Sequence, residues 1–170
     1  INALRVWQKF FNAIPKKQSL TGFPIWANEF GATYPYDKIP YRMSQEELGK
    51  YRGTFGVDLK NLSKEEQLNR IPNYSKKDLE FPVWKKNFIQ QNRNLYNNHR
   101  EKIDKIIPLL KKISFPTLQK LEWNAGDSKR KIRDFFIQFR PSGIRIKKPI
   151  YFPTLVTSAS QNPVIGWQNR

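Results

Sequence analysis

The chain has 170 residues, which suits one domain of ordinary size. It has no Cys and one His, and this composition excludes disulfides, a thiolate nucleophile and a Cys/His zinc site. Its 31 Lys and Arg against 14 Asp and Glu give a formal net charge of +17, so a polyanion is the first partner to consider. A hydrophobic share of 38% excludes a disordered basic tail, because such tails lack the apolar area that offsets chain entropy.

The first predicted element is a helix over residues 2–14. Asn2 can cap its N-terminus, apolar residues recur at three- and four-residue spacing, and Pro15 stops it. We expect the apolar stripe to face the core. Its members are Leu4, Trp7, Phe10, Phe11 and Ile14.

Residues 23–41 are rich in aromatic side chains and interrupted by three prolines, without a helical or strand period. The pattern predicts an ordered but irregular segment. Its aromatic rings could stack on bases, but packing in the core is the favoured interpretation because aromatic residues dominate core burial. The rings in question are Trp26, Phe30, Tyr34 and Tyr36.

Three short motifs resemble functional ones but have simpler structural explanations. Ser44-Gln45-Glu46-Glu47 and Ser63-Lys64-Glu65-Glu66 fit the capping box, so their paired carboxylates indicate helix starts rather than an acid–base pair. Gly53-Thr54-Phe55-Gly56 has the spacing of a KH-type RNA clamp, but a plain turn is the favoured interpretation.

A long helical stretch is predicted from Pro82 toward Ile107, as a hairpin or one bent helix that Pro108 kinks or restarts. Its apolar stripe contains Trp84, Phe88, Leu95, Ile103, Ile106 and Leu110. The outer face is rich in amides that could bond phosphates and base edges, and a merely solvated face is the alternative. This outer set is Gln90, Gln91, Asn92, Arg93, Asn94, Asn97, Asn98 and Arg100.

After the turn signal at residues 124–127 the pattern changes to short strands over 135–140, 143–147 and 154–158. The predicted fold class is α+β, in which a helical N-terminal two-thirds packs with a small, mainly antiparallel, twisted C-terminal sheet. We expect a single domain over residues 1–170, helix-rich to about residue 125 and basic and β-rich over 126–170.

Positive charge is concentrated in the predicted sheet, where nine basic residues follow residue 128 against the single acid Asp134. Arg140 and Arg145 flank a Pro-Ser-Gly turn, and a rigidly held guanidinium can bond O6 and N7 of guanine, whereas Lys147 and Lys148 suit phosphates. Solvated charges that protect a strand edge from aggregation are the alternative.

The stretches "QFRPSGIRIKKPIYFPTLVTSAS" and "PVIGWQNR" resemble the target-recognition domain of bacterial DNA (cytosine-5)-methyltransferases. That domain contains a Gly-x-Arg-aliphatic turn and a later Thr-Leu pair, which look like residues 143–146 and 154–155 here. Upstream, "GFPIWANEFGATYPY", "FPVWKKNFIQQNR" and "LQKLEWN" look like the enlarged recognition regions of one subgroup. The family's Pro-Cys nucleophile, Glu-Asn-Val block and cofactor loop are missing from this chain.

The resemblance implies sequence-specific recognition of duplex DNA by one piece of a two-domain enzyme. It further implies a restriction–modification system and a place in the bacterial cytoplasm. The parent would transfer methyl from S-adenosylmethionine to C5 of cytosine, with no cofactor, metal or catalytic residue in this piece. Its partners would be duplex DNA and the catalytic domain of the same enzyme, with no membrane, since no apolar run could span a bilayer.

Two groups of site residues follow from the charge pattern and the resemblance. The base-reading candidates are Arg140, Arg145, Gln138 and Ser142, and the candidates for contacts to the DNA backbone are Arg133, Gly143, Lys147, Lys148 and Thr154. An RNA-binding or ribonucleoprotein module could use the same basic, aromatic surface, and a domain that binds an acidic protein is a third possibility.

Overall fold

The computed structural model describes residues 2–127, 129–150 and, for the backbone alone, 162–165. The chain divides into two compact units, which are described separately below. Unit 1 comprises Ile1–Ile25 and Glu101–Arg170, and unit 2 comprises Trp26–Arg100. Helices and a small sheet are both present, so the predicted α+β class is confirmed.

Helix α1 (Ala3–Ala13) in unit 1 is the predicted first helix. The side chain of Asn2 accepts hydrogen bonds from the backbone N–H groups of Leu4 and Arg5, at 3.0 and 3.3 Å, which satisfies two of the free donors at the helix start. The predicted stripe is buried apart from Leu4, which is half-buried.

The sheet consists of β1 (Ile25–Trp26), β2 (Lys120–Asn124), β3 (Phe136–Arg140), β4 (Gly143–Lys147) and β5 (Asn162–Ile165), in the order β1-β2-β4-β3-β5. The pairs β3–β4 and β3–β5 are antiparallel, whereas β2 runs parallel to β4. The sheet is therefore mixed, and its parallel pair was not anticipated from the sequence.

Strands β3 and β4 form the predicted hairpin, with Pro141 and Ser142 as its exposed two-residue turn. Gly143 follows with φ of 128°. A Cβ atom at Gly143 would lie 2.7 Å from the backbone oxygen of Lys120, so both the conformation and the close approach require glycine.

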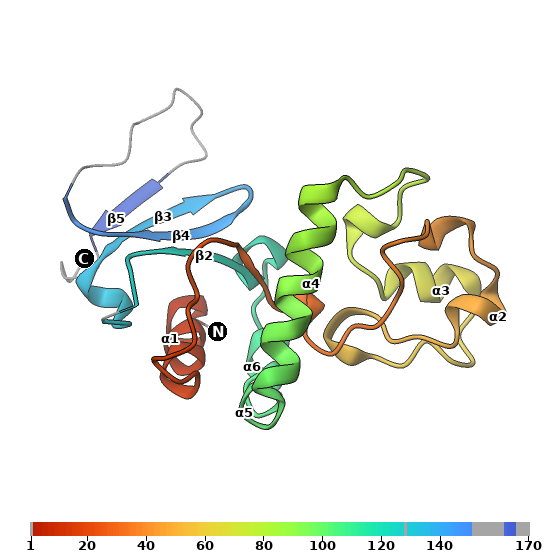
Figure 1. Cartoon of the computed structure of the whole chain (residues 1–170), viewed down its shortest axis with the longest axis horizontal. Coiled ribbons are helices and arrows are strands. Elements are labelled where there is room, and N and C mark those ends of the chain that lie inside the picture. The colour runs from red at the N-terminus through yellow and green to blue at the C-terminus, as the bar shows by residue number, and fades with distance from the viewer. Residues whose placement is uncertain (1, 128, 151–161, 166–170) are drawn as a thin grey trace. The chain divides into compact units, whose positions relative to one another are not determined.

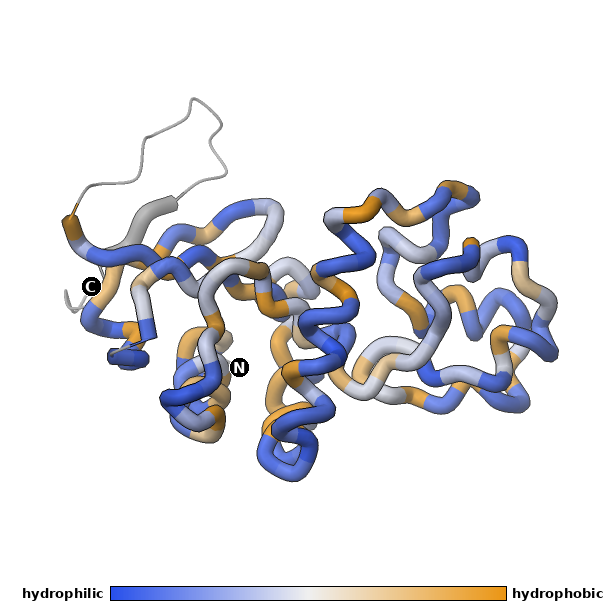
Figure 2. The backbone as a smooth tube through the Cα atoms, viewed as in Figure 1, coloured by the Kyte–Doolittle hydropathy of each residue, from blue (hydrophilic) through white to orange (hydrophobic). Residues whose placement is uncertain are grey.

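One face of this sheet is apolar and packs on α1. Leu121, Trp123, Ile144 and Ile146 alternate with polar residues along β2 and β4 and are buried. The ring of Trp123 lies 4.5 Å, centroid to centroid, from that of Phe11 on α1. Figure 1 shows α1 lying beneath the strands, and Figure 2 shows apolar and polar residues intermixed along them.

The long predicted helix is interrupted earlier than expected. Helix α4 (Val83–Asn98) starts directly after Pro82 but ends at His99, which has non-helical φ and ψ of −133° and 27°. Two short helices follow, α5 (Arg100–Asp104) and α6 (Ile107–Lys111). The run of Asn and His at this point has weak helix propensity, which explains a stop the apolar periodicity did not reveal. Pro108 lies in the first turn of α6.

Unit 2 contains α4 and two short capped helices, α2 (Gln45–Leu48) and α3 (Lys64–Asn69). Both predicted capping boxes are present, at Ser44 with Glu47 and at Ser63 with Glu66. The remaining part of the unit is connected by short 3-10 turns, among them one at Thr54–Gly56, so the Gly-x-x-Gly motif forms the predicted turn.

The aromatic segment packs inside unit 2 as predicted, since Trp26, Phe30 and Tyr34 are buried and Tyr36 is partly buried. The prediction that Trp84 faces the core is wrong, because its side chain is 54% exposed. Trp84 lies in the first turn of α4, where it contacts Phe88 edge to face at 5.7 Å between ring centroids.

The amide-rich face of α4 is only partly a solvent face. Asn92 is fully buried, where it accepts a hydrogen bond from the backbone N–H of Trp26 at 2.7 Å and donates to the carbonyl of Phe88 at 2.8 Å. Arg93 forms an ion pair with buried Glu29 at 3.0 Å. These two side chains therefore hold unit 2 together rather than face a ligand.

Candidate nucleic-acid interface

The sheet face opposite α1 carries a cluster of cations. Glu122 on β2 lies beside Arg145 on β4, and Arg145 lies beside Gln138 on β3, so all three side chains project from the same face. The polar and charged residues that strand alternation places on this face form what we call the basic face. Its members are Lys120, Glu122, Asn124, Gln138, Arg140, Arg145 and Lys147.

Glu122 is the only acid of the basic face, and it binds two arginines through one oxygen. Its Oε2 accepts from Nη2 of Arg140 at 2.6 Å and from Nε of Arg145 at 3.1 Å, and it forms an ion pair with Nη2 of Arg145 at 3.0 Å. Its Oε1 accepts from Nδ2 of Asn124 at 2.6 Å. The carboxylate thus draws two like charges together beside the hairpin turn.

The pKa of Glu122 lies below its ordinary value of 4.5. Partial burial alone would raise that pKa, but hydrogen bonds from Arg140, Arg145 and Asn124 outweigh burial and stabilise the carboxylate. Glu122 is therefore ionised at neutral pH, which keeps the arginine pair in place.

Replacement of Glu122 by Gln is expected to lower the free energy of unfolding at pH 7 by about 1–2 kcal/mol, because charge-assisted hydrogen bonds are lost and two arginines repel each other. The folded-state pKa of Glu122 is depressed, so its contribution is complete above the ordinary carboxyl pKa and disappears as the pH falls through the folded-state pKa. Urea unfolding at pH 7 and pH 3 should therefore show a difference between variant and parent that shrinks at pH 3. An equal difference at both pH values would contradict this role.

The other predicted site residues occupy varied positions in unit 1. Gln138 is buried on the basic face with 5% of its surface exposed, and Gly143 is buried against the backbone of Lys120. Ser142 at the turn and Lys148 after β4 are exposed. Thr154 lies outside the described residues.

Arg133, also predicted to contact DNA, is exposed but belongs to a different surface. It lies in the 3-10 turn Ile132–Asp134, before β3, and lines a cleft beside α1. The structure therefore brings Arg140, Arg145 and Lys147 together on the basic face and separates Arg133 from them.

Glu122 and Lys120 were missed because strand β2 was not predicted. The stretch Lys120–Asn124 has the alternation of polar and apolar residues that is typical of a half-buried strand, with Leu121 and Trp123 inward. It comes directly before the turn signal, where the sequence was assigned to the helical part. That alternation was the signal that could have revealed strand β2, but not the strand with which it pairs.

Within the described part of the chain no helix is long and apolar enough to cross a membrane. The same residues contain no cluster of three or more acidic or histidine side chains that could hold a metal ion.

A comparison with known proteins finds that part of the chain is similar to a methyltransferase. The chain is 33% identical over 95 residues to the type II methyltransferase M.AluI of Cellulosimicrobium cellulans, a match that covers 52% of this chain. The match covers 17% of that relative's length, so the chain corresponds to a small part of such a protein. No protein-family model and no solved structure matches the chain.

The chain is thus related to a type II methyltransferase over about half its length. This relationship supports the resemblance noted in the sequence at the level of a methyltransferase.

Proposed function

We propose that this chain is a duplex DNA recognition domain of a DNA (cytosine-5)-methyltransferase, in which the β3–β4 hairpin reads bases. The relationship to M.AluI supports a methyltransferase role, and the net charge of +17 supports a polyanionic ligand. The observation that carries the proposal is the arginine pair held by Glu122 beside the exposed Pro141-Ser142 turn.

The chemistry of this pair suits base recognition. A guanidinium has five N–H donors, and Glu122 accepts a hydrogen bond from Nε of Arg145 and pairs with its Nη2, which leaves further donors on Nη1 and Nη2 for O6 and N7 of guanine. A restrained guanidinium loses little rotamer entropy on binding. Ser142 at the turn could add a hydroxyl contact, while Lys147 and Lys148 would neutralise phosphates.

In this proposal, another part of the parent enzyme catalyses the methyl transfer. The chain has no Cys that could attack the C6 atom of cytosine. S-adenosylmethionine carries a positive sulfonium, which the cations lining the cleft beside α1 would repel. The catalytic domain of the parent enzyme would therefore bind the cofactor, and this chain would orient the duplex and help offset the few kcal/mol of flipping the cytosine.

The proposal is tested by measuring binding of the 170-residue chain to duplex DNA, single-stranded DNA and structured RNA between 50 and 200 mM salt. We expect a preference for duplex, with affinity falling roughly a thousandfold over this range if about six phosphates are contacted. Tight binding to RNA with weak binding to duplex would instead support a ribonucleoprotein module. Loss of all nucleic-acid binding at moderate salt would point to an acidic protein partner.

A further inference from the structure

Unit 1 has a second basic surface, on the α1 side of the sheet. A cleft of about 1200 Å³ lies between α1, the loop that follows it and residues 129–134. Ile137 also lines this cleft, and its side chain projects from β3 on the side opposite to Gln138 and Arg140. The cleft and the basic face are therefore separate surfaces on either side of β3.

The cleft wall is fixed by two anchoring side chains. Gln8 on α1 donates to the carbonyl of Arg130 at 2.8 Å and accepts from the backbone N–H of Ile132 at 2.8 Å. The guanidinium of Arg130, 5% exposed, donates to the carbonyls of residues 14, 15, 16 and 18 and pairs with Asp127 at 3.1 Å. The charge of Arg130 is thus used internally, to hold the wall against the end of α1.

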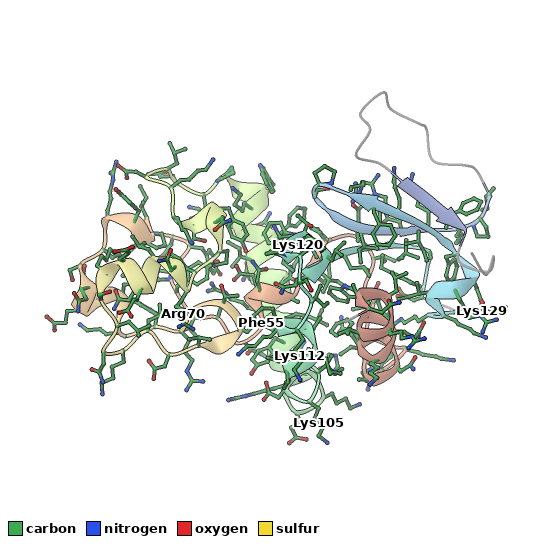
Figure 3. The ribbon with its side chains drawn as sticks, turned by 180° about the vertical axis from the view of Figure 1, so that it is seen from behind. Phe55, Arg70, Lys105, Lys112, Lys120 and Lys129 are labelled. Carbon is green, nitrogen blue, oxygen red and sulfur yellow. The ribbon has the colours of Figure 1, made fainter. Side chains whose placement is uncertain are left out.

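Burial alternates along this wall, so three of its cations are exposed. Arg130 and Ile132 are buried anchors, whereas Lys129, Lys131 and Arg133 are exposed. Arg5 and Lys16 add two exposed cations from the opposite side of the cleft, and Asp134 is the one acid among the described residues that line it. Figure 3 shows Lys129 projecting from the periphery of the unit.

We propose that this cleft binds consecutive phosphates of a nucleic-acid strand, as a second contact surface separate from the hairpin. The inference rests on the proposed function, since it takes DNA as the ligand. Five exposed cations are spread along an open cleft that is larger than the roughly 300–1000 Å³ typical of small-molecule sites, so a chain of phosphates fits better than a single anion. Phosphates carry no sequence information, so this surface would add affinity without discrimination.

The test compares two double variants that remove the same charge from unit 1. Lys129→Ala with Lys131→Ala alters the cleft, and Lys105→Ala with Lys112→Ala alters exposed lysines that do not line it (Figure 3). The cleft variant is expected to reduce the slope of log affinity against log salt by roughly 1.8 for duplex DNA, which is about 0.9 for each lost contact. Its affinity should fall roughly tenfold at moderate salt, equally for every duplex, while the control changes little.

Equal changes in both variants, or an unchanged slope in the cleft variant, would overturn the cleft inference. If Arg145→Ala still removed sequence discrimination in that case, the proposed function would survive without the cleft. Absence of duplex binding by the parent chain would overturn both. Thermal unfolding of each variant shows whether it is folded, and exposed Lys→Ala changes should stay within about 0.5 kcal/mol of the parent.

Discussion

Replacement of Arg145 by Ala is expected to abolish discrimination between duplex sequences at the position it reads, with a ten- to hundredfold loss of affinity for the preferred site. A bidentate contact from arginine to guanine contributes about 1–3 kcal/mol of discrimination. The preferred site can be found by selecting bound duplexes from a randomised library with the parent chain. The ratio of the variant's affinities for the selected and for unrelated duplexes then measures its sequence discrimination directly.

The matched control is Lys147→Ala, because Lys147 lies two residues from Arg145 on the same strand and face. As a phosphate contact, Lys147 should weaken binding uniformly and reduce the salt slope by about 0.9. If Arg145→Ala also weakened binding to every duplex equally, Arg145 would not read bases. That result would leave Arg145 as one more phosphate contact on the basic face.

The arrangement around Glu122 explains why a charged strand can be half-buried. Without a carboxylate, Arg140 and Arg145 would repel each other on neighbouring strands. Glu122 removes that repulsion and fixes the guanidiniums, while the apolar side of the same strands packs on α1. The strands can therefore carry positive charge outward without losing their core contacts.

Local patterns in the sequence predicted the elements whose signals are local. The cap at Asn2, the two capping boxes and the Pro-Ser-Gly turn each depend on residues within a few positions of each other, and each is present. The hairpin arginines could likewise be singled out. Their shared partner could not, because Glu122 is 18 residues from Arg140 and meets it only through the pairing of β2 with β4.

The burial of polar side chains was the other feature that could not be predicted from the sequence. Asn92 and Arg93 follow the polar pattern of an exposed helix face, yet they bind Trp26 and Glu29, which lie more than 60 residues earlier. A periodicity argument assigns polar residues outward unless a distant partner is known. Buried polar networks are therefore invisible in a single sequence, although they specify how the irregular aromatic segment packs.

Replacement of Glu29 by Gln is expected to lower the free energy of unfolding by about 3–5 kcal/mol, because it leaves Arg93 without its counter-charge in a buried setting. Glu29 is fully buried, accepts from the hydroxyls of Tyr34 and Tyr74, and binds Arg93 Nε at 3.0 Å. Burial raises the pKa of both tyrosines well above their usual value, so both remain protonated donors at neutral pH. A glutamine would place an amide donor among these donors.

Urea unfolding followed by tryptophan fluorescence gives the measurement, and Glu65→Gln, on an exposed position of α3, is the matched control within unit 2. The control should change the free energy by no more than about 0.5 kcal/mol. Arg93→Met should recover part of the loss when combined with Glu29→Gln, since removing both charges also removes the unpaired one. Equal losses for Glu29→Gln and Glu65→Gln would show that the Glu29 network does not stabilise unit 2. Additive losses in the double variant would show that Glu29 acts independently of Arg93.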